Sequence, residues 1–127
     1  MDGWNDGKEA TQAAFREAFR CQRCLVPATH FFEWTGPKDG KTMWRFSKAN
    51  ADVFCFPGLW DVAETSDGRI ESFTIVTTTP GLDCEPYHNR QPVVLEPDQW
   101  ATCLDLTADP APCLRAGLKG VIAVERA

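Results

Sequence analysis

Glu33 is the first residue whose type and setting could support chemistry. It lies in the segment His30-Phe31-Phe32-Glu33-Trp34, where large aromatic side chains surround a single carboxyl group. A strand this apolar rarely carries a carboxylate without a partner. If the strand buries the carboxyl group, the loss of hydration raises its pKa and suits it to proton transfer near neutral pH. A solvent-facing position in an amphipathic strand is the alternative, and these residues alone leave both open.

His88 is the second such residue, and it is one of only two histidines. The hydroxyl run Thr77-Thr78-Thr79 precedes it, and Arg90 follows two residues later. Arginine and threonine side chains commonly hold phosphate groups. A histidine beside them could protonate a sugar or phosphate oxygen near neutral pH. The alternative is a packed structural histidine.

The cysteines give weaker signals. Cys21 and Cys24 form a Cys-x-x-Cys pair, but structural zinc usually needs four ligands and no second pair exists in the sequence. A redox pair is expected where a helix begins after a strand, whereas this one follows a predicted helix and enters a predicted strand. We therefore predict reduced thiols, no metal site and no cofactor. A small structural or zinc-stabilised domain that uses Cys21 and Cys24 stays open as an alternative.

Length and charge limit the class of protein. The chain has 127 residues, which fits one domain, and its net charge of −5 argues against a generally nucleic-acid-binding surface. Residues 15–48 nevertheless carry seven of the thirteen Lys and Arg and only three of the eighteen Asp and Glu, so a local basic face is compatible with the sequence. The first residues do not resemble a signal peptide, and no apolar run is long enough to span a membrane. We expect a cytoplasmic protein without a membrane partner.

Short apolar or alternating runs separated by turn clusters dominate the chain. Good helix formers predict a helix over residues 8–20, and carboxylates and a proline at its start predict another over 96–105. A short helical turn is expected within 108–117. The fold class is α+β, with a mixed, mostly antiparallel, β-barrel-like core and a few peripheral helices. The expected strands lie in residues 24–28, 30–34, 43–47, 53–62, 72–78, 91–95 and 118–127, with a turn cluster at 65–70.

The order of the motifs is more specific than any single motif. RCLVPATHFFEW, FPGLWD, SFTIVTTTPG and HNRQPVVL follow one another between about residues 20 and 100. This succession resembles the SRAP family, the SOS response-associated peptidases and abasic-site processing proteins. The resemblance implies a mixed α/β domain around a barrel-like core. It also implies binding of single-stranded DNA that carries an abasic site.

The family's chemistry depends on a cysteine that becomes N-terminal. Its amine forms a Schiff base with the sugar aldehyde, its thiol then closes a thiazolidine, and an autopeptidase activity frees the cysteine when a leader precedes it. By this resemblance Glu33 handles the proton on the amine, and His88 assists opening of the sugar ring. Arg90 is the expected phosphate contact, and Thr77 is expected near the DNA. Asn5 is the asparagine nearest to the place of the family's Asn-x-Arg motif, so it is a third DNA-contact candidate.

The chain also departs from the family pattern. It begins Met1-Asp2-Gly3, without a cysteine at position 2, and Gln91 replaces the usual Met or Arg. We expect a single domain over residues 1–127 that lacks roughly the N-terminal third of the family domain, with self-association through the strand edges this leaves exposed. Without a thiol beside an α-amine no thiazolidine can close, so the 127-residue chain is not expected to form the stable cross-link. A binding module for damaged or single-stranded DNA without catalysis is the alternative.

Overall fold

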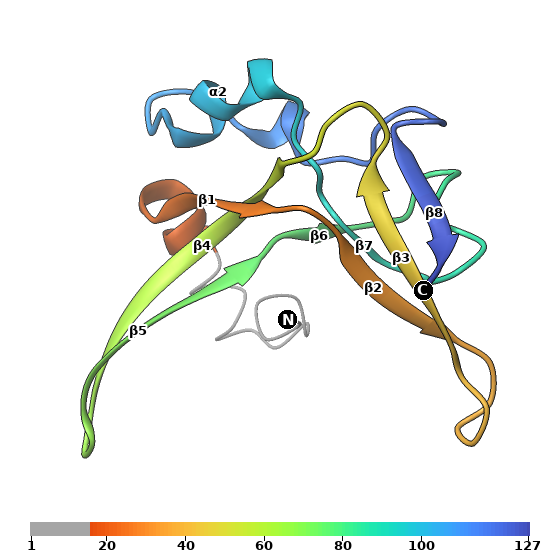
Figure 1. Ribbon diagram of the computed structural model, residues 1–127. Coiled ribbons are helices and arrows are strands. Elements are labelled where there is room, and N and C mark those ends of the chain that lie inside the picture. The colour runs from red at the N-terminus through yellow and green to blue at the C-terminus, as the bar shows by residue number, and fades with distance from the viewer. Residues whose placement is uncertain (1–15) are drawn as a thin grey trace.

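Two three-stranded antiparallel sheets make up most of the protein, for which a computed structural model describes residues 16–127 (Figure 1). The first sheet has the order β1-β4-β5, and the second has the order β2-β3-β8. A two-stranded ribbon, β6-β7, forms the third sheet. The strands are β1 Arg23–Ala28, β2 Phe31–Thr35, β3 Thr42–Lys48, β4 Phe54–Thr65, β5 Gly68–Ile75, β6 Thr77–Thr78, β7 Gln91–Pro92 and β8 Ile122–Arg126.

The helices are short. Residues 16–21 are helical and lead into β1. Late in the chain, the 3-10 turn η1 (Pro97–Gln99) continues into α2 (Trp100–Leu104), and η2 (Ala111–Cys113) follows. The predicted helix over residues 8–20 is therefore seen from residue 16, and its first part lies outside the described residues. Within residues 16–127, no helix has the length and apolar character needed to cross a membrane.

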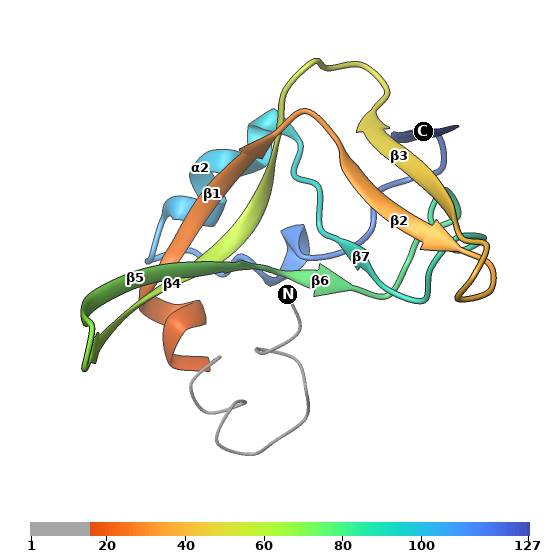
Figure 2. The same cartoon turned by 60° about the horizontal axis from the view of Figure 1, so that its bottom comes forward.

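The predicted α+β class with mostly antiparallel sheets is confirmed, with two differences. The three sheets of the described residues do not close into a barrel. In addition, Gly68, Arg69 and Ile70 belong to β5, although the sequence places them in a turn cluster. The turn is tighter than expected because Gly68 adopts a φ of 106°, which lets the strands pair up to the Thr65–Gly68 register. The long β4-β5 hairpin extends from the rest of the molecule in both views (Figures 1 and 2).

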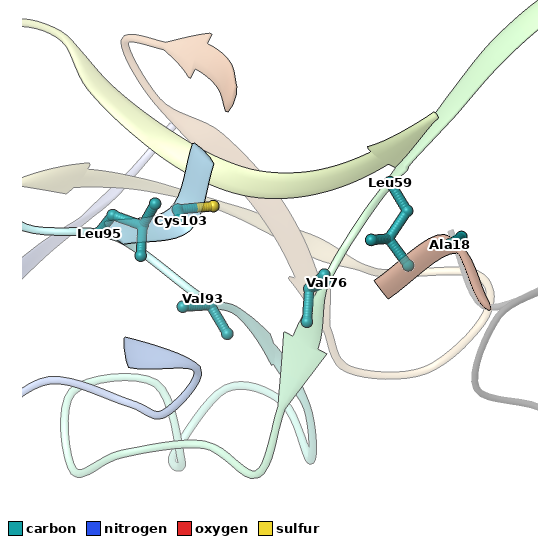
Figure 3. Close-up of a cluster of buried hydrophobic side chains, with 6 residues drawn as sticks. All are labelled: Ala18, Leu59, Val76, Val93, Leu95 and Cys103. Carbon is teal, nitrogen blue, oxygen red and sulfur yellow. The ribbon is translucent and has the colours of Figure 1, made fainter. Parts of the chain in front are cut away.

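One core cluster packs under the β1-β4-β5 sheet. Its members come from the N-terminal helix, β4, the segments around β6 and β7, and α2 (Figure 3). Leu59 on β4 approaches Ala18 of the helix, while Leu95 lies beside Cys103 of α2. Burying this apolar surface holds the helices against the sheet. The buried residues are Ala18, Leu59, Val76, Val93, Leu95 and Cys103.

A second, more aromatic cluster packs under the β2-β3-β8 sheet. Phe46 on β3 is fully buried and stacks on Phe31 of β2 at a centroid distance of 4.8 Å. Val94 belongs to this cluster, whereas its neighbours Val93 and Leu95 belong to the first. The apolar run after β7 therefore lies between the two cores, and alternate side chains fill one or the other. The buried members are Phe46, Phe54, Phe56, Cys84, Val94 and Ile122.

Two charged side chains connect segments that are distant in sequence. The guanidinium group of Arg23 on β1 donates hydrogen bonds to the carbonyl oxygens of Phe19, Cys103 and Asp105, which ties the N-terminal helix to the end of α2. The carboxylate of Asp83 accepts hydrogen bonds from the N–H groups of Gly120 and Ile122, which ties the turn after β6 to the segment that leads into β8. Hydrogen bonds to a charged partner are stronger than neutral ones, so these ties fix the ends of the sheets.

Several strand edges are open in the described part of the chain. Strands β1 and β5 end the first sheet, and β2 and β8 end the second. Most of β5 is exposed. Unpaired edges of this kind can pair with another chain. Self-association through them stays a prediction.

Candidate functional site

Strand β2 directs Glu33 toward the core side of its sheet. Phe31, Glu33 and Thr35 are half-buried, whereas Phe32 and Trp34 are exposed. The alternation that the sequence predicts is therefore present, but the solvent-facing alternative for Glu33 is wrong. The side chain of Glu33 is 19% exposed, at the rim of the aromatic core. The other histidine, His30, lies with its ring against exposed Phe32.

A compact helical turn brings His88 to the same place. The backbone N–H groups of residues 84, 85, 87 and 88 bond to carbonyl oxygens of residues 81 and 84, which coils the chain between β6 and β7. The base of this coil is closed by Gln91, whose buried side-chain oxygen accepts a hydrogen bond from the Gly81 N–H at 2.8 Å. His88 follows directly after the coil. Its Nε2 atom lies 3.6 Å from the Glu33 Oε2 atom.

The backbone of Arg90 can accommodate both protonation states of His88. Its N–H lies 3.2 Å from His88 Nδ1, and its carbonyl oxygen lies 3.1 Å from the same atom. In a neutral ring, Nδ1 accepts from the Arg90 N–H and the ring proton resides on Nε2, facing Glu33. In a charged ring, Nδ1 donates to the Arg90 carbonyl while Nε2 still faces Glu33. His88 can therefore gain or lose a proton without leaving its place, as an acid–base group must.

Arg90 and Thr77, both predicted as DNA contacts, lie together beside this pair. The Arg90 Nη2 atom donates to the Thr77 Oγ1 atom at 3.0 Å. Thr77 is buried and Arg90 is half-buried, so the threonine fixes one side of the guanidinium group. A guanidinium group has five N–H donors, and a single threonine contact leaves donors for an anion. The sequence predicted the two residues but not the bond between them.

Contacts of the coil with the β2-β3-β8 sheet align the two site residues. Trp44 on β3 lies directly opposite Glu33, and its ring packs on Tyr87, the residue before His88, at 4.9 Å. The carboxylate of Asp83 accepts hydrogen bonds from the N–H groups of Gly120, at 3.0 Å, and Ile122, at 3.1 Å. These contacts hold the coil against the sheet from two sides. Nothing in the local sequence marked Asp83 or Tyr87 for this role.

Comparison with known proteins assigns the chain to a family. The sequence model of the SOS response associated peptidase (SRAP) family matches residues 6–123. The chain belongs to the SRAP family. The resemblance seen in the sequence motifs is thereby confirmed.

Individual SRAP relatives agree with this assignment. The chain is 35% identical over 85 residues to the abasic site processing protein YoqW of Bacillus subtilis, which covers 65% of this chain and 38% of that protein. It is 34% identical over 89 residues to the abasic site processing protein YobE of the same organism, covering 68% of this chain and 40% of that one. The chain thus spans about two fifths of the length of these curated relatives.

Solved structures share the fold. A protein from Bacteroides thetaiotaomicron superposes with a TM-score of 0.80 over 98% of this chain and 55% of its own, at 21% identity. A phage-related protein from Bordetella bronchiseptica gives a TM-score of 0.66 and 27% identity, over 89% of this chain and 56% of its own. Because the Bacteroides protein is only 21% identical to this chain, its similarity shows a shared fold and nothing more.

The SRAP resemblance did not identify Cys84, which is the thiol of the candidate site. It is 2% exposed and lies one helical turn before His88. Burial, together with the carboxylates of Asp83 and Glu33, raises the pKa of the Cys84 thiol to about 12. A thiol at this pKa stays protonated near neutral pH and is a poor nucleophile. Cys84 is therefore no substitute for a reactive N-terminal cysteine. The four-residue spacing to His88 was the one sequence signal for its position.

We expect Cys84 to make stability fall at alkaline pH. Its pKa is about 12 in the folded protein, against an ordinary value of 9.0. The unfolded chain therefore loses this proton first, and the stabilisation present below pH 9 is lost as the pH rises toward 12. The free energy of unfolding should fall by about 1.4 kcal/mol per pH unit in this window, on account of this group alone.

Urea unfolding at pH 8 and pH 10 under reducing conditions measures this effect. Cys84→Ala should have the shallower pH dependence, whereas Cys21→Ala, which removes an exposed thiol, should retain that of the parent. Burial also raises the pKa of Cys24, Cys55 and Cys103, but these thiols are common to all three proteins. Equal slopes in the two variants would contradict the assignment.

The remaining sequence candidates do not add to the site. Cys21 is exposed, and its thiol lies within 3.7 Å of Glu17, while Cys24 lies on β1. Within residues 16–127, no three Cys, His, Asp or Glu side chains are grouped so that they could hold a metal ion. A zinc site at Cys21 and Cys24 would therefore lack a third ligand among residues 16–127. Asn5 lies outside the described residues, and its role as a DNA contact stays a prediction.

Proposed function

We propose that this SRAP-family chain binds single-stranded DNA at an abasic site, with Glu33 and His88 as the acid–base pair that acts on the open sugar. The observation that carries the proposal is the 3.6 Å approach of His88 Nε2 to Glu33 Oε2, between residues that are 55 positions apart. A carboxylate that faces an imidazole, in turn oriented by a third group, is a common arrangement for proton transfer. The names of the related proteins, which refer to abasic-site processing, support the same substrate.

Arg90 and Thr77 are the proposed contacts to the DNA backbone. The contact between Arg90 and Thr77 supports this role, because it holds the guanidinium group beside the acid–base pair. A phosphate next to the lesion would accept hydrogen bonds from the remaining N–H donors. Thr77 would then act mainly by positioning Arg90, since its own side chain is buried.

Binding to labelled single strands tests the substrate. Fluorescence anisotropy compares a strand with one central tetrahydrofuran residue, a stable abasic analogue, against the intact strand. We expect tighter binding of the abasic strand, by about tenfold or 1.4 kcal/mol, and weakening as salt increases. Arg90→Ala should weaken both strands alike, because phosphates carry no sequence information.

His88→Ala and His30→Ala form a matched pair in this experiment. Both histidines are exposed, but His30 lies on the outer side of β2. His88→Ala should reduce the preference for the abasic strand, and His30→Ala should retain it. The absence of salt-dependent binding at low ionic strength would contradict the proposal. Equal binding of both strands would favour the alternative of a DNA-binding module without catalysis.

A further inference from the structure

Strand register places an arginine from the far end of the chain on the same face as Glu33. Glu33 on β2 lies opposite Trp44 on β3, and Trp44 lies opposite Arg126 on β8. Residues directly opposite one another in antiparallel strands point to the same face. Adjacent strands are about 4.8 Å apart, so Arg126 lies about 10 Å from Glu33 across the sheet.

The neighbours of Arg126 show which face this is. In the adjacent row, Phe46 lies opposite Val124, and both contribute to the aromatic core. Arg126 is two residues beyond Val124, so it occupies the same face at the rim where the core ends. Tyr87 packs on Trp44 in this row. The coil that carries His88 therefore packs, through Tyr87, on the row formed by Glu33, Trp44 and Arg126.

Among residues 16–127, no acidic side chain neutralises Arg126. It is exposed, and it forms no ion pair or side-chain hydrogen bond with any of residues 16–127. Arg45, on the same sheet, provides the contrast. It points to the outer face, where its Nε atom donates to the Glu125 carboxylate at 2.8 Å.

The backbone around Arg126 is held in place. Arg126 is paired with Trp44, and the N–H of Ala127 bonds to the Met43 carbonyl at 3.0 Å. A charged group on an ordered strand binds an anion at a lower entropic cost than one on a free tail. An arginine on this face with no partner among residues 16–127 has the chemistry of a phosphate contact.

We propose that Arg126 is a second phosphate-binding residue for the DNA strand that crosses the Glu33–His88 pair. Arg90, which follows His88, would hold one phosphate, and Arg126, at the end of the row that begins with Glu33, would hold another. This inference rests on the proposed function. It adds a residue outside the motifs by which the chain resembles its family.

Salt titration tests this inference with the abasic-analogue strand. Each phosphate contact contributes about 0.7 to the slope of log K against log salt for single-stranded DNA. Between about 50 and 200 mM salt, Arg126→Gln should lower that slope by about 0.7. Arg126→Lys should keep it, because the charge remains. Arg90→Ala combined with Arg126→Gln should lower it by about 1.4.

Arg45→Gln is the matched control, since Arg45 lies on the opposite face of the same sheet and is already paired. It should keep the slope of the parent. A slope for Arg126→Gln that equals the slope for Arg45→Gln would overturn the role of Arg126 while leaving the proposed function intact. Failure of the parent chain to bind the strand would overturn both. Thermal melting of each variant confirms that it is folded.

Discussion

Addition of a small aminothiol to the protein and abasic-site DNA should give a thiazolidine faster than the aminothiol does alone. The family's chemistry needs a thiol beside an α-amine, and Met1 and Asp2 of this sequence are not cysteines. Cysteine methyl ester can supply both groups from solution. Its amine adds to the sugar aldehyde, one water leaves to give the imine, and its thiol then adds to the C=N bond. In our proposal His88 donates a proton as the ring opens, and Glu33 removes one from the amine.

Variants of the two site residues should remove this acceleration. Positioned acid–base groups typically contribute about 10²- to 10⁴-fold, so Glu33→Gln and His88→Ala should each lose about 10²-fold or more. His30→Ala and Glu125→Gln change the same residue types on the outer side of the sheet and should retain the rate. The product is measured by mass spectrometry of the DNA. Equal rates for the parent and Glu33→Gln would refute the acid–base assignment. When the 127-residue chain and abasic-site DNA are mixed without aminothiol, we expect no stable shifted band of cross-linked DNA on a denaturing gel.

Phe46→Ala should bring the protein close to unfolding. Phe46 is fully buried and stacks on Phe31. It also packs edge-to-face with the Tyr87 ring, at a centroid distance of 5.5 Å. Removal of a buried phenyl ring costs about 3 to 5 kcal/mol through lost burial and the cavity that remains. Domains of this kind have a total stability of about 5 to 15 kcal/mol. The midpoint of urea unfolding should therefore fall markedly.

Phe73→Ala is the control for this prediction, because Phe73 is 63% exposed on β5. Its loss should change the free energy of unfolding by less than about 1 kcal/mol. Tyr87 would also lose its packing partner in Phe46→Ala, so binding of the abasic strand should weaken under conditions in which the variant is still folded. Similar stability for the two variants would show that the aromatic cluster is not the main core.

Much of the fold was predictable from local pattern. Each of the seven predicted runs overlaps a strand of the described residues, but the run 72–78 covers both the end of β5 and β6, and β7 is shorter than the run 91–95. Pro97 after Glu96 marked the start of the late helix. The outward side of β2 was not predictable, since Phe32 and Trp34 are as apolar as Phe31. Which face is buried depends on what packs against the strand, and local sequence does not contain that information.

The site was predictable only through motif order. Local propensity does not bring Glu33 to His88, because their approach depends on how the coil docks on a distant sheet. The positions of Asp83, Cys84 and Arg126 depend on long-range pairing for the same reason. The register of β8 against β3 joins residues about 80 positions apart, and it alone reveals that Arg126 shares a face with Glu33.

The contacts of Asp83 set an order of events during synthesis. Glu33, Asp83 and His88 are all made before β8, but Asp83 finds its partners only when Gly120 and Ile122 have left the ribosome. Until then, β3 has an unpaired edge and the coil that carries His88 lacks one of its two attachments to the sheet. A nascent chain that stops before residue 120 would contain both members of the acid–base pair without their alignment. Alignment of the acid–base pair therefore requires translation to proceed beyond Ile122.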